Sequence, residues 1–318
     1  MRKLSLILGT TLGALTVAAI AAITLGSRPS VGACAAVALP GATTSYRVQA
    51  ADGNCLQGHV WMPGAVPVRA AVVVVHGLHD HALRYAPLAR ALNAQGMVVL
   101  AQDHRGHGAS GGARQRVDSM AQLASDVQWA LNEAHKRYPG VPLFLHGHSM
   151  GGLVVAHLAA SSETPLKGAI VSSAALKRPA NASDGQIAVL RALSAVAPGL
   201  PVEPIDEKLF VRDAAARAAL ASDPVIDREK VPARTVAAVL AGIDGIQALM
   251  PSLQTPLLVL HGGADQVTDP EGSRQLASRA RAATLNIYPN ALHDLLNEPE
   301  GPAVQQAIVD FVEARLRP

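Results

Sequence analysis

Ser149 lies at the centre of a G-x-S-x-G pattern at positions 147–151. A short apolar run at 142–145 precedes this pattern, and a stretch of small residues at 152–160 follows it. A strand that turns sharply into a helix needs glycine on both sides of the serine, because a Cβ there would collide with neighbouring backbone. Such a turn exposes the serine hydroxyl and directs the next backbone N–H, that of Met150, at a reacting oxygen. The pattern therefore predicts a nucleophilic serine rather than a chance repeat of common residues.

A serine hydroxyl becomes a good nucleophile only when a base takes its proton and an acid orients that base. Asp265 follows the apolar run 256–261, and His293 follows the run 284–288. Both residues should therefore lie just past the carboxyl end of a strand, where the serine turn also lies. The order serine, acid, histidine predicts that Ser149, Asp265 and His293 form a catalytic triad.

Two other acids compete with Asp265 for this role. Asp269 could reach the same loop, whereas we expect Asp244 on a helix. The base has no such competitor, because His293 is the only histidine after Asp265. We therefore expect Asp265 and His293 to be the partners of the serine.

Acyl transfer also needs N–H donors for the developing oxyanion. One donor is expected to be the Met150 N–H. The other should come from the loop after the apolar run 70–76, where Gly77 lets the backbone approach closely and the Leu78 N–H is our choice. His76 is expected to brace this loop rather than to react.

The histidine-dense stretch HGLHDH at 76–81 raises the alternative of a metal site. Zinc hydrolases can use an H-x-H-x-D-H loop, but the first interval here is one residue too long and no second set of ligands stands out downstream. The glycine-rich stretch DHRGHG at 103–108 is a weak phosphate cradle, since no helix begins directly after it and G-K-[ST] is missing. We expect neither a metal nor an organic cofactor.

The segments that must position these residues alternate between two kinds of pattern. Apolar runs of strand length are separated by stretches with helical spacing. Strands are expected at 44–50, 56–63, 70–76, 97–101, 142–145, 167–173, 256–261 and 284–288, and helices at 84–94, 119–138, 152–160 and 302–316. This alternation predicts an α/β fold with an eight-stranded, mostly parallel sheet flanked by helices, whose first two strands form an antiparallel edge hairpin.

The region between residues 173 and 256 breaks this alternation. It contains no convincing strand, and its apolar residues follow helical spacing instead, at 187–196, 213–221 and 236–250. We interpret it as a helical cap inserted into the core, because it leaves and re-enters at strand ends beside the serine turn. The alternative is a set of extra helices with no role at the site. The predicted divisions are a leader and linker at 1–40, a core at 41–173 and 256–318, and a cap at 174–255.

Composition limits the kinds of partner that the chain can bind. The chain has 318 residues, of which 49% are hydrophobic and only 3% aromatic, so an apolar pocket must be lined mainly by aliphatic side chains. The formal net charge is only +3, and no basic face is interleaved with aromatics. These features argue against nucleic-acid binding.

The N-terminus predicts export. A basic start at 1–3 is followed by an uncharged apolar run at 4–26 and a polar break at 27–30. A cleaved signal peptide, an uncleaved anchor and a lipoprotein signal ending at Cys34 all remain open. We expect a periplasmic or cell-envelope location, with a membrane anchor or lipid as alternatives. Cys34 and Cys55 either form a disulfide, or Cys34 is lipidated or removed and Cys55 is a buried thiol.

Taken together, these motifs resemble the monoacylglycerol lipases of the α/β-hydrolase superfamily, in the group that includes lysophospholipases and S33 serine aminopeptidases. The resemblance covers residue 45 to the C-terminus. It rests on short motifs at 76–77, 84–85, 103–110, 147–152 and 261–265.

The resemblance implies an α/β-hydrolase fold whose cap shapes an apolar acyl channel. It also implies Ser149 as nucleophile, Asp265 and His293 as its partners, and the Leu78 and Met150 N–H groups as the oxyanion hole. The substrate would be a small lipid ester, monoacylglycerol-like or lysophospholipid-like, with membrane association through the N-terminal segment and cap. No oligomeric state is implied.

Two functions from other classes are compatible with the sequence. A serine aminopeptidase would need acids in the cap to hold the substrate amine, and Glu203, Asp206 and Glu207 are available. A non-catalytic envelope protein could instead bind a lipid through its cap. The sequence also departs from the lipase group at His79 and Asp80. The family's contacts with the substrate head group therefore cannot be assigned to residues of this chain.

Overall fold

The computed structural model describes residues 34, 41–162, 164–180, 182–202 and 206–317. The predicted leader therefore lies outside the described residues except for Cys34. Glu203, one of the acids considered for an aminopeptidase, lies outside them as well.

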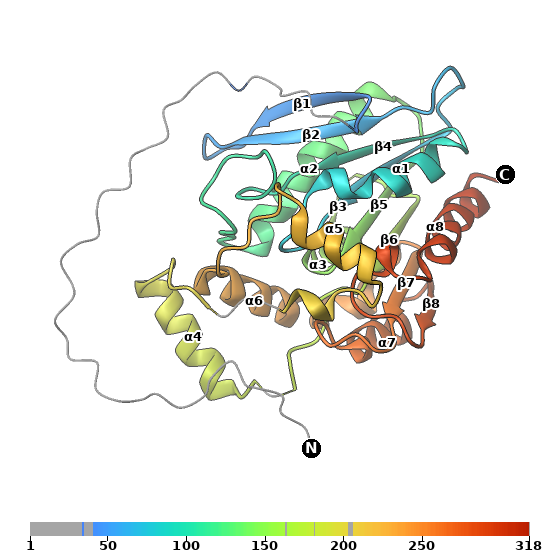
Figure 1. Ribbon diagram of the computed structural model, residues 1–318. Helices are drawn as coiled ribbons and strands as arrows, with labels where there is room; N and C mark the ends of the chain where they lie inside the picture. Colours follow the sequence, from blue (N-terminus) through green and yellow to red (C-terminus); the bar gives the residue numbers. More distant parts are fainter. Residues whose placement is uncertain (1–33, 35–40, 163, 181, 203–205, 318) are drawn as a thin grey trace, which may run out of the picture.

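An eight-stranded sheet forms the centre of the molecule (Figure 1). Its strands are β1 Thr44–Gln49, β2 Cys55–Trp61, β3 Ala70–Val75, β4 Met97–Gln102, β5 Leu143–His148, β6 Gly168–Ser172, β7 Leu257–Gly262 and β8 Ala283–Tyr288. Their spatial order is β1-β2-β4-β3-β5-β6-β7-β8. The pairs β1–β2 and β2–β4 are antiparallel and the other pairs are parallel. The predicted sheet and its antiparallel edge hairpin are confirmed.

Helices cover both faces of the sheet, so its central strands are apolar on both sides. The flanking helices are α1 Ala86–Asn93, α2 Met120–Arg137, α3 Met150–Ser161, α7 Pro270–Arg279 and α8 Gly301–Leu316. Alternate residues of β3 enter different core clusters, one formed with α2 and α3 and the other with α1 and α8. This double burial explains why β3 reads as an unbroken apolar run.

Helix α7 was missed by the sequence analysis. It begins with Pro270, and the Asp269 side chain caps it by accepting a hydrogen bond from the Glu271 N–H at 2.9 Å. Leu276 is its only large buried apolar residue. A single such residue leaves no apolar stripe to recognise, so only packing against β7 and β8 reveals the helix.

Between β6 and β7 the described chain forms α4 Asp184–Val196, α5 Ala214–Ser222 and α6 Ala233–Leu249. Figure 1 shows α4 away from the sheet, while α6 packs on α2 and α3 as well as on α4. The extent of the cap, residues 174–255, stays our prediction.

Cys34 and Cys55 form a disulfide in the structure, which is the first of the two alternatives left open by the sequence. The bond joins the start of β2 to the segment that precedes the sheet. Neither cysteine is then a free thiol.

His146 is an unusual residue for a central strand. It lies within β5 and is fully buried, and neither ring nitrogen has a hydrogen-bond partner among the residues that the structure describes. Its ring stands edge-on to Tyr85, with 5.9 Å between ring centroids. Burial, with a smaller contribution from His148, lowers the pKa of His146 from 6.5 to about 3. The ring is therefore neutral in the folded chain near pH 7.

This burial predicts an acid-sensitive contribution to stability. Between pH 6.5 and about pH 3 the unfolded chain binds a proton at His146 and the folded chain does not, so the folded state loses stability as the pH falls. We expect His146→Leu to raise the free energy of unfolding at pH 7 by about 1–3 kcal/mol, because it removes an unpartnered buried polar ring. We also expect the free energy of unfolding to fall less between pH 7 and pH 5 in His146→Leu than in the wild type.

Urea unfolding at both pH values measures these effects. His135→Leu, on the exposed side of α2, is the matched control and should change little. A His146→Leu variant less stable than the wild type at both pH values would contradict the prediction.

Candidate active site

Ser149 occupies the sharp turn between β5 and α3. Its backbone has φ 55° and ψ −118°, in a region that residues with a Cβ rarely adopt. The Ser149 N–H donates to the Ser172 carbonyl at 2.9 Å, and the Ser149 carbonyl accepts from the Leu153 N–H at 3.1 Å. The Ala175 N–H also donates to the Ser149 carbonyl, at 3.2 Å. The first bond of α3 and two bonds to the segment at the end of β6 thus hold a strained conformation, which is typical of functional turns.

Close backbone approach explains the glycines around this turn. A Cβ on Gly151 would overlap the carbonyl oxygens of Val75 and His76, at the end of β3. A Cβ on Gly77 would lie 3.1 Å from the Ser149 Cβ. The loop that follows β3 therefore lies directly against the serine, as expected for a loop that supplies an oxyanion donor.

Asp265 and His293 are brought together from loops after β7 and β8. Asp265 Oδ2 lies 2.8 Å from His293 Nδ1, and both side chains are buried. The His293 ring also packs on His148, which immediately precedes the serine, with ring centroids 4.7 Å apart. The predicted acid and base are thus a hydrogen-bonded pair beside the serine turn.

Asp265 is held in its ionised form by its surroundings. Its Oδ1 accepts from the N–H groups of Val267 at 2.8 Å and Thr268 at 3.1 Å. Its Oδ2 lies 3.1 Å from His261 Nε2 and accepts from Thr268 Oγ1 at 2.8 Å. Burial by itself raises the pKa of Asp265, but the charge of His293 and the hydrogen bonds from His261 and His293 lower it further than burial raises it. Its pKa falls well below the usual range.

His261 and Thr268 were not predicted as site residues. His261 is fully buried, and its other ring nitrogen, Nδ1, lies 2.6 Å from Ser273 Oγ on α7. The spacing of four residues between His261 and Asp265, across the end of β7, was the signal available in the sequence.

The two competing acids have other partners. Asp269 caps α7 and forms an ion pair with Lys177 at 2.6 Å. Asp244 lies on α6, where it pairs with Arg178 and Arg191. Their carboxylates are therefore engaged elsewhere, and Asp265 is the acid that contacts His293.

His76 braces the loop after β3, as expected. Its Nε2 accepts from the His104 N–H at 2.9 Å, and His104 Nε2 donates to the His76 carbonyl at 3.1 Å. Leu78 lies in the loop after β3 and Met150 is the first residue of α3, and these two segments meet at Ser149. Because the first N–H groups of a helix lack partners within it, Met150 remains our predicted oxyanion donor, together with Leu78.

A narrow polar pocket adjoins these residues. It is lined by Leu78, His79, Asp80, Arg84, His148, Glu207, Phe210, Leu220 and Asp294. Arg84 bridges two of its acids, at 2.8 Å from Asp80 and 2.6 Å from Asp294. Burial is the largest single influence and raises the pKa of Asp80, but the charges of Arg84, His76, His81 and His148 together hold that pKa well below the usual range.

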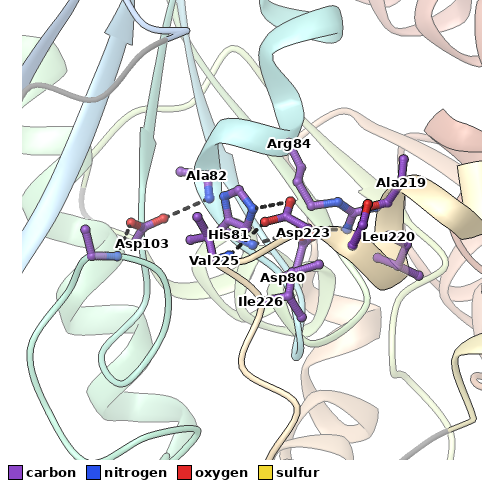
Figure 2. Close-up of polar contacts among 12 residues, drawn as sticks. Asp80, His81, Ala82, Arg84, Asp103, Ala219, Leu220, Asp223, Val225 and Ile226 are labelled. Atoms are coloured by element: carbon purple, nitrogen blue, oxygen red, sulfur yellow. Dashed lines mark hydrogen bonds and ion pairs between the residues drawn. The ribbon is translucent and has the colours of Figure 1, made fainter.

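Helix α5 is joined to the loop after β3 by a polar contact. Figure 2 shows Asp223, at the end of α5, facing His81, with 2.9 Å between Asp223 Oδ2 and His81 Nε2. On the other side, Asp103 accepts from the Ala82 N–H at 2.8 Å (Figure 2). His76 and His81 of the HGLHDH stretch therefore have separate partners, His104 and Asp223. Across the described ranges, no three His, Cys, Asp or Glu residues are grouped as a metal site would require.

Comparisons with known proteins place the chain beside lipases. The family model described as serine aminopeptidase, S33, matches residues 66–300. The chain is 33% identical over 259 residues to the monoacylglycerol lipase of Mycolicibacterium smegmatis, covering 81% of this chain and 92% of that protein. It is 34% identical over 251 residues to human monoglyceride lipase, covering 78% and 82%.

Comparison with solved structures also finds similarity to a monoacylglycerol lipase. The crystal structure of the Paleococcus ferrophilus monoacylglycerol lipase superposes with a TM-score of 0.74 at 29% identity, covering 82% of this chain and 99% of that one.

The backbone strain at Ser149 predicts a difference in stability between two variants at this position. Ser149→Ala keeps a Cβ at φ 55°, whereas Ser149→Gly relieves the strain. We expect the glycine variant to be the more stable of the two by about 1 kcal/mol, measured by thermal unfolding. Equal stabilities would mean that the turn is not strained.

Proposed function

This chain belongs to the serine aminopeptidase S33 family of α/β-hydrolases and is a hydrolase related to monoacylglycerol lipases; on that premise we propose that it cleaves monoacylglycerol-like or lysophospholipid-like esters through an acyl-enzyme on Ser149. The observation that carries the proposal is the buried Asp265–His293 hydrogen bond beside the strained serine turn. An exposed hydroxyl, a base and an oriented acid are the groups that acyl transfer requires.

The proposed reaction has two halves. Ser149 Oγ attacks the ester carbonyl while His293 Nε2 takes its proton, and Asp265 holds the imidazole through Nδ1. The Leu78 and Met150 N–H groups stabilise the oxyanion. The alcohol leaves with the proton from His293. Water then attacks the acyl-enzyme, with His293 again acting as base, and releases the fatty acid.

Relatives support a lipid ester as the substrate. The Mycolicibacterium smegmatis and human proteins are named as monoacylglycerol and monoglyceride lipases. The scarcity of aromatics in this chain means that aliphatic side chains would line an acyl channel.

The aminopeptidase alternative finds less support. Of its candidate acids, Asp206 accepts a hydrogen bond from the Lys208 N–H at 2.9 Å and caps a short 3₁₀ turn. Glu207 lies 3.2 Å from Arg228. Both carboxylates already have partners among the described residues, and the relatives named as lipases favour ester hydrolysis.

We further propose that the enzyme acts outside the cytosol, in the periplasm or cell envelope. The apolar leader motivates this location, and a Cys34–Cys55 disulfide is stable in an oxidising compartment. Membrane association through the leader and cap belongs to the same proposal. Fractionation of cells that produce the full chain tests it, and recovery in the cytosol would exclude it.

Replacing the nucleophile is the direct test of the proposed mechanism. We expect Ser149→Ala to reduce hydrolysis of glyceryl esters by several orders of magnitude. A fluorophosphonate probe should label the wild type at Ser149 and should not label the variant. Full esterase activity in a correctly folded Ser149→Ala variant would exclude the mechanism, and an unlabelled wild type would favour a lipid-binding role.

Replacing the acid tests its assignment against the nearest competitor. We expect Asp265→Asn to lower kcat by about 10³–10⁴, because an amide cannot hold His293 in the reactive tautomer. Asp269→Asn is the matched control, since asparagine also caps helices and the change should affect activity little. A larger loss in Asp269→Asn than in Asp265→Asn would reverse the assignment.

A further inference from the structure

His261 is a buried histidine near the end of β7, four residues before the acid Asp265. The proposed reaction gives it no step, because Ser149 and His293 already supply the nucleophile and the base. Its ring nevertheless lies against the carboxylate of Asp265, with 3.1 Å between His261 Nε2 and Asp265 Oδ2. The distances from Nε2 to Thr268 are longer, 3.3 Å to Oγ1 and 3.4 Å to the carbonyl oxygen. Asp265 is therefore the main partner of this nitrogen.

The partners of the His261 ring determine which of its nitrogens carries the proton. An ionised carboxylate only accepts hydrogen bonds, so Nε2 must donate to Asp265. The other nitrogen, Nδ1, lies 2.6 Å from Ser273 Oγ on α7, and the Ser273 hydroxyl can donate to it. Ser273 is fully buried as well. Ser273 therefore holds a neutral His261 in the tautomer whose N–H points at Asp265.

His261 and His293 share a single oxygen atom of Asp265. His293 Nδ1 lies 2.8 Å from Oδ2, the same atom that contacts His261. A third group near Oδ2, the Thr268 hydroxyl, lies 2.8 Å from it but also 2.9 Å from the Ser173 carbonyl oxygen. Its one proton can serve only one of these acceptors at a time. The His261 N–H is therefore the steadier of the two donors that accompany His293.

This sharing has two consequences for the base. The His261 N–H helps to fix the position of Oδ2, and Oδ2 in turn orients the His293 imidazole towards Ser149. A hydrogen bond to a carboxylate also stabilises its charge, so the carboxylate attracts a proton on His293 less strongly. Protonated His293 is therefore favoured less than it would be beside an unshared Asp265.

The other ionisable groups near the two rings are held by contacts that a change at residue 261 leaves in place. Burial and the neighbouring His293 lower the pKa of His148 to about 4, so its ring is neutral near pH 7. The remaining groups are carboxylates with ion-pair partners: Asp294 with Arg84, and Asp269 with Lys177. A change in the titration of His293 in a variant of His261 therefore reports the contact with Asp265.

We propose that His261 is a positioning residue of the active site, whose Nε2–H shares Asp265 Oδ2 with His293 and thereby both orients the base and keeps it unprotonated to lower pH. The effect on turnover rests on the proposed ester hydrolase function. The effect on the titration of His293 can be measured without a substrate.

Two amide variants separate the donor from the rest of the side chain. The nitrogen of glutamine lies about as far from the backbone as Nε2 of histidine, and that of asparagine about as far as Nδ1. His261→Gln can therefore still donate to Asp265. His261→Asn keeps a polar contact with Ser273 but does not reach Asp265, so both variants retain a buried partner on α7.

The first measurement is the pH profile of kcat/KM for glyceryl octanoate, which reports the ionisation of the free enzyme. We expect its acidic limb to move up by about 0.5–1 pH unit in His261→Asn and to stay close to the wild-type position in His261→Gln. On the plateau, kcat per fluorophosphonate-labelled site should fall by about tenfold in His261→Asn with KM little changed, because the base is less well oriented.

The second measurement follows the proton between Asp265 and His293 by ¹H NMR, where such a proton resonates far downfield. The midpoint of its pH titration should rise in His261→Asn by the same amount as the acidic limb. His146→Leu is the matched control, since this buried histidine of β5 has no hydrogen-bond partner among the described residues. It should move neither the acidic limb nor the NMR midpoint.

The outcomes separate this inference from the proposed function. An acidic limb and an NMR midpoint that stay in place in His261→Asn would mean that His261 only packs the core, and would overturn the inference even if kcat falls. Equal shifts in both His261 variants would also overturn it, because the N–H donor would not be the cause. A wild type that cleaves no ester, with the NMR midpoint shifted as expected, would overturn the proposed function and support the role of His261.

Discussion

The close approach of three backbone segments at Ser149 is the constraint on which the site depends. β5 ends between β3 and β6, and the turn to α3 fits only because Gly77 and Gly151 carry no Cβ. The Ser172 carbonyl, at the end of β6, accepts the Ser149 N–H and helps to hold φ at 55°. The position of the half-buried serine is thus a product of the parallel order β3-β5-β6 rather than of the pentapeptide alone.

Asp265 and His293 lie on the loops after β7 and β8, at the same edge of the sheet as Ser149, and the groups around Asp265 keep it ionised. Burial alone would favour a neutral Asp265, but His261, His293 and Thr268 surround its carboxylate and keep it ionised. His261 is in turn held by Ser273 on α7. The least apolar helix of the core therefore contributes to the orientation of the base.

Polar contacts join the segment between β6 and β7 to the site. Asp223 pairs with His81, and Arg212 bonds Glu298 and Glu300. The Asp294 N–H donates to the Phe210 carbonyl at 2.8 Å, while the Phe210 ring packs on His293 with 5.5 Å between ring centroids. This segment therefore covers His293 and also forms one wall of the polar pocket beside it.

Local patterns were sufficient for the sheet and for the order of the reactive residues. Buried parallel strands are continuous apolar runs, and their carboxyl ends share one edge, so Ser149, Asp265 and His293 could be assigned to that edge from the sequence alone. Four features were decided only by tertiary structure: α7, the Cys34–Cys55 pairing, the partners of Asp269, and the burial of His79 Nε2 without a partner among the described residues. Each depends on which distant groups meet, and sequence spacing does not determine long-range contacts.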